Sequence, residues 1–142
     1  MSEPEFQWPV RVYYEDTDAG GVVYHASYLK FMERARTEWL RQLGWQQESL
    51  FRESGLLFAV ARMEIDFLAS AHLDDALNVT VTLKEQKRVS LTLEQTITCK
   101  TTLKPVLIWA RVRIALLNRD FKPARFPVEL RDRLQLLLDE RL

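Results

Sequence analysis

The sequence predicts an α+β domain in which one long helix is enclosed by an antiparallel sheet. Two observations lead to this expectation. A single segment carries apolar residues at helical spacing over an unusually wide arc, and five segments alternate apolar with polar residues as half-buried strands do. The expected order is one strand, the long helix, four strands and a terminal helix. The helix lies over residues 28–43, and the strands lie over 6–15, 57–67, 77–83, 91–99 and 106–116.

The spacing of apolar residues changes from every second residue in the first strand to helical spacing in the long helix. On the strand, one parity carries the apolar side chains Trp8, Val10, Val12 and Tyr14. On the helix, the buried stripe is expected to be Tyr28, Met32, Ala35, Trp39 and Leu43, with Lys30, Arg34, Glu38 and Arg41 opposite. Gly44 is expected to end the helix as a left-handed cap. Because Leu29, Phe31 and Leu40 widen the apolar arc, other elements must wrap this helix.

The remaining elements are expected to supply that wrapping. A short helix over 46–53, ended by Gly55, precedes a strand whose buried face is Leu57, Ala59, Ala61, Met63, Ile65 and Phe67. The next two strands bury Leu77, Val79, Val81 and Leu83, then Leu91, Leu93, Ile97 and Cys99. A short polar junction over 85–90 favours an antiparallel hairpin between these two strands.

The last strand is expected over 106–116, between Pro105 and the segment 118–123, with a terminal helix over 128–138. Its buried face is Val106, Ile108, Ala110, Val112, Ile114 and Leu116, and its second face carries the apolar residues Leu107 and Trp109. A sheet that cannot hide both faces favours self-association, so we expect a homo-oligomer.

Composition and charge narrow the function. The 142 residues balance 20 basic against 20 acidic side chains, which gives no field for nucleic acid or an anionic membrane. One cysteine excludes an internal disulfide, and we expect neither a signal peptide nor a membrane-spanning segment. We therefore expect a single cytoplasmic domain over residues 1–142.

Candidate chemistry lies between the first strand and the long helix. Asp16, Asp18 and His25 flank two glycines here, just before a helix start whose unpaired N–H groups can polarise a carbonyl oxygen. Each of these residues also has an ordinary structural role, as a turn, capping or helix-start residue. Tyr14, on the apolar parity of its strand, has a core position as its ordinary role.

Other chemistries find little support. A calcium loop beginning at Asp16 would need a polar oxygen at its fifth position and an acidic residue at its twelfth, but Gly20 and Ser27 occupy them. The chain has no serine-nucleophile elbow and no glycine-rich phosphate loop. Cys99 is expected to be buried and unreactive, and His72, beside Asp74 and Asp75, to be solvated. We expect no metal and no cofactor.

The run from Tyr14 to His25, which reads YEDTDAGGVVYH, resembles the 4-hydroxybenzoyl-CoA thioesterase family, as do Tyr28 and the following Glu-Arg-Ala-Arg helix. Within that family it is similar to the YbgC branch, acyl-CoA thioesterases associated with the bacterial Tol-Pal system. The likeness covers nearly the whole chain. It implies a hotdog fold, a long helix cradled by an antiparallel sheet, and dimers that pair into tetramers with active sites at subunit boundaries.

The resemblance also assigns roles by position. It places the catalytic aspartate at Asp18, supporting polar residues at His25 and Tyr14, and the carbonyl-polarising amide at His25 or a close neighbour. Lys87, Arg88 and Ser90 match a segment near the CoA phosphates, although a solvated hairpin tip is the alternative for these residues.

Hydrolysis of acyl-CoA thioesters is the predicted function. A carboxylate, ionised at neutral pH, can attack the thioester carbonyl or act as general base toward water, and the sequence leaves both open. His25 could orient the carboxylate, bind water or protonate the thiolate, and Tyr14 could hold Asp18 or the substrate. The alternatives are a non-catalytic acyl-binding or scaffold protein and a hotdog dehydratase. The expected partners are acyl-CoA, an acyl carrier protein and further copies of the chain.

Overall fold

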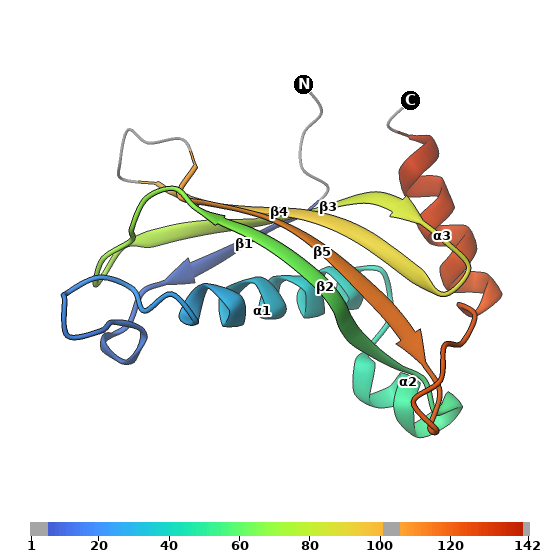
Figure 1. Ribbon diagram of the computed structural model, residues 1–142. Helices are drawn as coiled ribbons and strands as arrows, with labels where there is room; N and C mark the ends of the chain where they lie inside the picture. Colours follow the sequence, from blue (N-terminus) through green and yellow to red (C-terminus); the bar gives the residue numbers. More distant parts are fainter. Residues whose placement is uncertain (1–5, 101–105, 141–142) are drawn as a thin grey trace.

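The computed structural model describes residues 6–100 and 106–140, and it places a five-stranded antiparallel sheet along one long helix (Figure 1). The strand order is β1-β3-β4-β5-β2, so β1 and β2 are the edge strands. The predicted α+β hotdog arrangement is confirmed. In chain order the elements are β1 (Phe6–Arg11), a 3₁₀ turn (Tyr14–Asp16), α1 (Ser27–Gln42), α2 (Gln47–Ser54), β2 (Leu57–Phe67), β3 (Ala76–Gln86), β4 (Ser90–Cys99), β5 (Ile108–Leu117) and α3 (Val128–Asp139).

The long helix α1 packs on β1 and β3 through the predicted stripe. Of the three residues expected to widen the apolar arc, Phe31 and Leu40 are buried, whereas Leu29 is 39% exposed, so the prediction was wrong for Leu29. Gly44 follows the helix with φ +97°, the left-handed conformation that lets the chain turn away toward α2. The stripe residues buried along α1 are Tyr28, Met32, Ala35 and Trp39.

The helix-facing side of the sheet is made mainly by β3, β4 and β5, whose alternation matches the prediction. Burial of a large aliphatic side chain contributes about 1.5–3 kcal/mol, so this layer supplies much of the stabilisation. The predicted hairpin between β3 and β4 is confirmed, because Leu83 pairs with Leu93 and Gln86 with Leu91. The fully buried apolar strand residues are Leu77, Val79, Val81, Leu83, Leu93, Ile97, Ile108, Ala110, Val112 and Leu116.

Edge strand β2 differs from the prediction because it contains a bulge. Val60 pairs with Ile114 and Arg62 with Arg113, so Ala61 is left unpaired between them. An extra residue on one strand reverses the parity of the side chains on either side of it. The predicted buried face was therefore wrong before the bulge, where Phe58 and Val60 take the face predicted for Leu57 and Ala59. It was also wrong for Ala61 and Phe67, which are exposed. The side chains of β2 that share a face with the core residues of β5 are Phe58, Val60, Met63, Ile65 and Phe67, whereas Leu57 and Ala59 share a face with Leu117 and Ala115.

The first strand is shorter than predicted. It ends at Arg11, and the chain then enters the 3₁₀ turn because the Asp16 carboxylate accepts a hydrogen bond from the backbone N–H of Tyr13 at 2.8 Å. Tyr14 is consequently 82% exposed, and its expected position on the apolar face of a strand was wrong.

The start of the last strand also differs from the prediction. β5 begins at Ile108, and Leu107 precedes it as a buried residue, not as part of an exposed second face. The Leu107 carbonyl accepts hydrogen bonds from the N–H groups of Leu68 and Ala69 at 2.8 and 3.0 Å, which places this residue under the β2–β3 connection. Pro105, expected to bound the strand, lies outside the described residues. No helix in the described part of the chain is long and apolar enough to cross a lipid bilayer.

Candidate active site

The loop over residues 16–24, between the 3₁₀ turn and α1, is closed by its own backbone hydrogen bonds. The Asp18 N–H donates to the Val22 carbonyl at 2.9 Å, and the Tyr24 N–H donates to the Asp16 carbonyl at 2.8 Å. Gly21 lies at the turn with φ +83°, a conformation that favours glycine. Asp18 therefore lies in a loop whose backbone is fixed by its own hydrogen bonds. The segment before α1 is at the left of Figure 1.

The carboxylate of Asp18 is exposed and is held from one side. Its Oδ1 accepts a hydrogen bond from the backbone N–H of Gly20 at 2.8 Å. A Cβ atom at position 20 would lie 3.2 Å from that same oxygen, which makes glycine the best fit there. Within the described residues, Oδ2 has no hydrogen-bond partner. One oxygen is thus oriented by the backbone and the other is available to a substrate or a water.

Asp16, the other acid of the loop, has a different environment. It is 8% exposed, and its carboxylate accepts from the Tyr13 N–H while its carbonyl accepts from Tyr24. Asp16 therefore stabilises the loop, whereas Asp18 lies open to solvent.

The loop is anchored to the segment that enters β3. The Val23 N–H donates to the Ala71 carbonyl at 2.9 Å, and the Ala71 N–H donates to the phenol oxygen of Tyr28 at 2.9 Å. Burial raises the pKa of Tyr28, the Ala71 hydrogen bond lowers it, and the negative charges of Asp75 and Asp18 raise it further. The negative charge of Asp18 therefore contributes to the raised pKa of Tyr28, in the first turn of α1.

His25 lies just before α1 among aromatic rings. Its ring centroid is 4.6 Å from that of Tyr24 and 6.2 Å from that of Phe67, which meets it edge-on. Ala26, the residue at the helix cap, makes no side-chain capping bond. The backbone N–H groups of His25 and Ala26 have no acceptor among the described residues, and they lie at the positive end of the helix dipole. Such groups can polarise a carbonyl oxygen.

The three predicted catalytic residues share one stretch of chain but are not hydrogen-bonded to one another. Across residues 6–100 and 106–140, no hydrogen bond joins Asp18 to His25 or to Tyr14. The Tyr14 carbonyl accepts hydrogen bonds from the N–H and the hydroxyl of Thr17, and the Tyr14 side chain extends into solvent. The structure adds Phe67 to the site, which the strand pattern had placed only in the core.

The predicted CoA-binding residues lie at the other end of the sheet. Ala76, the first residue of β3, pairs with Arg11 near the 16–24 loop. Lys87 follows the far end of the same strand, which is about 33 Å away at 3.3 Å per residue (Figure 1). Lys87 and Arg88 are exposed, the Lys87 N–H donates to the Ser90 carbonyl at 2.8 Å, and the Lys87 ammonium lies 3.4 Å from the Glu85 carboxylate.

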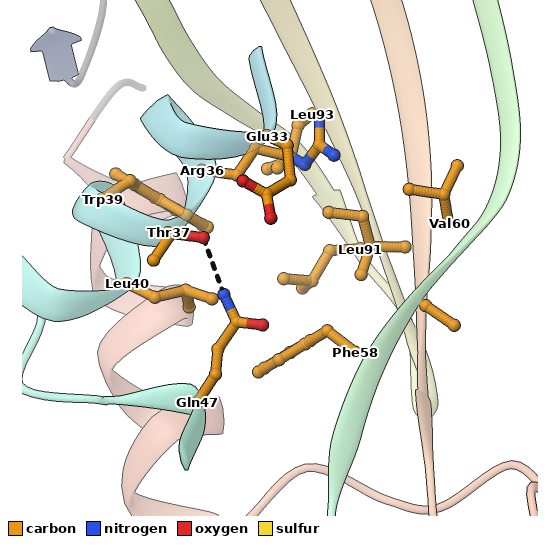
Figure 2. A pocket seen from close by; sticks show the side chains of 12 residues that line it. Glu33, Arg36, Thr37, Trp39, Leu40, Gln47, Phe58, Val60, Leu91 and Leu93 are labelled. Atoms are coloured by element: carbon orange, nitrogen blue, oxygen red, sulfur yellow. Dashed lines mark hydrogen bonds between the residues drawn. The ribbon is translucent and has the colours of Figure 1, made fainter. Parts of the chain in front are cut away.

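A second feature of the helix-facing side is a cavity of about 130 Å³ between α1 and β2 (Figure 2). Its walls come mainly from the later turns of α1 and from β2, β4 and β5. It is mostly apolar, with a few polar groups. The lining residues are Glu33, Arg36, Thr37, Trp39, Leu40, Gln47, Phe58, Ala59, Val60, Leu91, Leu93 and Ile114.

Two further residues carry reactive side chains, and one of them, His72, lies beside the 16–24 loop, because it forms an isolated β-bridge with Val22. Cys99 is buried at the end of β4, as predicted, and His72 is exposed with its Nδ1 3.9 Å from the Asp75 carboxylate. In the part of the chain that the structure describes, no three His, Cys, Asp or Glu side chains are grouped closely enough to hold a metal ion.

Comparison with known proteins adds independent findings. The family model described as the thioesterase-like superfamily matches residues 12–134. The acyl-CoA thioesterase YbgC of Haemophilus influenzae is 46% identical over 132 residues, which cover 92% of this chain and 95% of that protein. A probable thioesterase from Bartonella henselae superposes with a TM-score of 0.79 at 39% identity, covering 85% of this chain and 98% of that one. A Thermus thermophilus thioesterase complexed with coenzyme A and Zn gives 0.78 at 27% identity, covering 94% and 99%.

Proposed function

Because this chain belongs to the thioesterase-like superfamily, we propose that Asp18 is the catalytic carboxylate of an acyl-CoA thioesterase. Hydrolysis of acyl-CoA thioesters is the activity of the chain. The observation that carries the assignment of Asp18 is the pairing of an open carboxylate oxygen with the uncapped start of α1. A nucleophile or base and a carbonyl-polarising group thus lie on the same short loop.

The proposed reaction uses these groups on a thioester that is already reactive. The N–H groups of His25 and Ala26 donate hydrogen bonds to the carbonyl oxygen as its negative charge develops. Asp18 then attacks the carbonyl carbon to give a mixed anhydride that water opens, or it removes a proton from an attacking water. In either case the carbon–sulfur bond breaks and CoA leaves as a thiolate, which takes up a proton to give the free thiol.

His25 and Tyr14 are proposed to support this reaction. The exposed His25 ring lies beside the loop and is suited to protonate the leaving thiolate. Tyr14 makes no hydrogen bond with Asp18 among the described residues and its ring is solvent-exposed, so we assign it to substrate contact.

We further propose that the active site is completed by a second copy of the chain. The exposed rings of Tyr13, Tyr14, Tyr24 and Phe67 surround the loop, and β2 presents an unpaired edge beside them. Lys87, Arg88 and Ser90 are too distant from Asp18 in the same chain to bind the same thioester closely, which supports binding of CoA phosphates to the partner's hairpin. A homodimer or homotetramer meets this requirement.

The remaining expectations stand as proposals. They comprise a single domain over residues 1–142, a cytoplasmic location, work with the Tol-Pal system and an acyl carrier protein as a second partner. The resemblance of the Asp18 loop to the YbgC branch supports them.

A panel of acyl-CoA thioesters with detection of released thiol tests the proposal. Thiol release by wild type, and its loss in Asp18→Asn, are the expected results. Binding of acyl-CoA without thiol release would favour a non-catalytic acyl-binding protein, and hydration or dehydration of the acyl chain would favour a dehydratase.

A further inference from the structure

Arg36 is a buried cation at one end of the cavity between α1 and β2 (Figure 2). Only 7% of the residue is exposed. Its Nη1 donates a hydrogen bond to Gln95 Oε1 at 2.9 Å, and Gln95 Nε2 donates to the Met32 carbonyl of α1 at 3.1 Å. Burial lowers the pKa of the guanidinium, while the negative charge of Glu33 raises it. A buried charge of this kind favours a nearby anion or hydrogen-bond acceptor.

One edge of this guanidinium is unused. Nε and Nη2 make no hydrogen bond with the described residues, and no carboxylate there lies within ion-pair distance of Arg36. These nitrogens are also not sealed in the core, because the side-chain atom that is both fully buried and unpartnered within the described ranges is Gln86 Oε1. Nε and Nη2 form the fork that binds a carboxylate through two parallel hydrogen bonds.

Glu33 lies at the same end of the cavity but is solvent-exposed (Figure 2). Water and salt screen an exposed charge far more than a buried one. The field inside the cavity is therefore dominated by Arg36, and the exposed Glu33 weakens it only in part.

Away from Arg36 and Glu33, the polar lining residues Thr37 and Gln47 are hydrogen-bonded to each other at 2.9 Å, and the remaining wall suits a short apolar segment. Leu91, Leu93 and Ile114 line it from the sheet, and Phe58 and Leu40 face it from β2 and α1 (Figure 2). An engineered cavity of about 150 Å³ lined by such side chains holds benzene. A volume of about 130 Å³ is thus enough for a few carbons and one polar head.

We propose that this cavity holds the far end of an acyl chain that terminates in a carboxylate, and that Arg36 selects such dicarboxylic acyl-CoA thioesters over apolar ones. The inference rests on the proposed function and names its substrate class. Arg36 lies nine residues after Ser27, the first residue of α1. That is about 13 Å along the helix, which a zigzag chain of about eleven or twelve carbons spans when extended.

The route to the cavity follows the open side of β2. Phe67 lies beside His25 and Tyr28 at one end, and Phe58 and Val60 line the cavity at the other. Met63 and Ile65, half-buried on the same face, lie between these ends. An acyl chain bound at the Asp18 loop can therefore run along an apolar surface to Arg36.

The test compares matched thioesters that differ only at the chain end, from hexanoyl-CoA and hexanedioyl-CoA to dodecanoyl-CoA and dodecanedioyl-CoA. In wild type, the kcat/KM ratio of diacid to monoacid thioester should exceed one at the length that reaches Arg36. Arg36→Met should lower this ratio by roughly 10-fold or more, because the fork that binds the carboxylate is gone. Arg36→Lys, which keeps the charge and loses the fork, should give an intermediate ratio.

Glu33→Gln gives a second readout at an exposed position where folding is not at risk. Removing this competing charge should raise the ratio. A purely structural role for Arg36 would lower kcat/KM for both members of a pair equally and leave the ratio unchanged, which would overturn the inference. A ratio at or below one at every length in wild type would also overturn it. Hydrolysis of neither member would instead contradict the proposed function.

Discussion

The phenol oxygen of Tyr28 accepts a hydrogen bond from the backbone N–H of Ala71 at 2.9 Å, with the tyrosine only 3% exposed. Ala71 in turn accepts from Val23 in the 16–24 loop. This pair joins the first turn of α1 to the segment that holds the loop, so the position of Asp18 depends on a contact that involves no catalytic group.

Tyr28→Phe should reduce stability at neutral pH by about 1–3 kcal/mol, because a buried N–H group loses its acceptor. Burial raises the pKa of Tyr28 above its ordinary value of 10.0. The unfolded phenol then ionises at lower pH than the native one, so wild type should lose stability as the pH rises above about 10. The difference in free energy of unfolding between wild type and Tyr28→Phe should therefore decrease as the pH rises above about 10. Urea unfolding measured from neutral to strongly alkaline pH checks this, and a constant difference would contradict it.

Asp18→Asn should lower kcat by roughly 100-fold or more if the carboxylate is catalytic, because the amide can neither attack nor remove a proton. The amide oxygen can still accept from the Gly20 N–H, so the fold should be retained. Asp16→Asn is the matched control, since Asp16 serves the loop backbone, and it should cost much less activity. Near-normal turnover by a folded Asp18→Asn protein would exclude the assignment.

A single turnover in heavy-oxygen water, with enzyme in excess, distinguishes the two roles of Asp18. Attack by Asp18, followed by hydrolysis of the anhydride at the enzyme carboxyl carbon, should put label into the peptide that contains Asp18. General-base catalysis should put label only into the released acid. Mass spectrometry of the Asp18 peptide and of the released acid shows where the label is, and Asp18→Asn supplies the unlabelled control.

Replacing Lys87 and Arg88 together with Ala should raise KM with little change in kcat. Contacts with CoA phosphates are equally strong in the ground state and the transition state. Lys100→Ala, an exposed cation at the opposite end of β4, is the control and should leave KM unchanged. If the double variant also keeps the wild-type KM, the two side chains belong to a solvated hairpin tip.

Light scattering should show a dimer or tetramer at working concentration. The exposed aromatic rings around the 16–24 loop and the unpaired edge of β2 supply the surface that association would bury. Phe67→Lys, at a half-exposed position on that edge strand, should shift the population toward monomer. A purely monomeric wild type would contradict the prediction.

Much of the fold could be predicted because its strongest patterns are local. The stripe of α1, the alternation of β3 and β4, and the left-handed glycines Gly44 and Gly55 are each visible in a few consecutive residues, and the structure confirms them. The assignments of Asp18, His25 and Tyr14 stay predictions. They came from a motif resemblance, and the structure adds only where these residues lie.

The errors arose where a distant or side-chain contact overrides the local pattern. Tyr14 continues the alternation of β1, but the Asp16 carboxylate turns the chain at Tyr13. Ala61 fits either face of a strand, so nothing in the sequence distinguishes a regular strand from a bulged one. The contact between Arg36 and Gln95 joins residues far apart in the chain, and neither segment alone predicts it.

The bulge at Ala61 also affects how related chains should be aligned. On one side of the bulge the even-numbered residues of β2 face the core, and on the other side the odd-numbered residues do. A one-residue insertion or deletion between positions 57 and 67 would therefore exchange cavity-lining and outward-facing side chains over only half of the strand. A homologue whose alignment has a gap here can therefore carry the same residues as this chain and yet have a differently shaped pocket. Transfer of substrate preference between such homologues should be judged by the position of the bulge before the identity of the aligned residues.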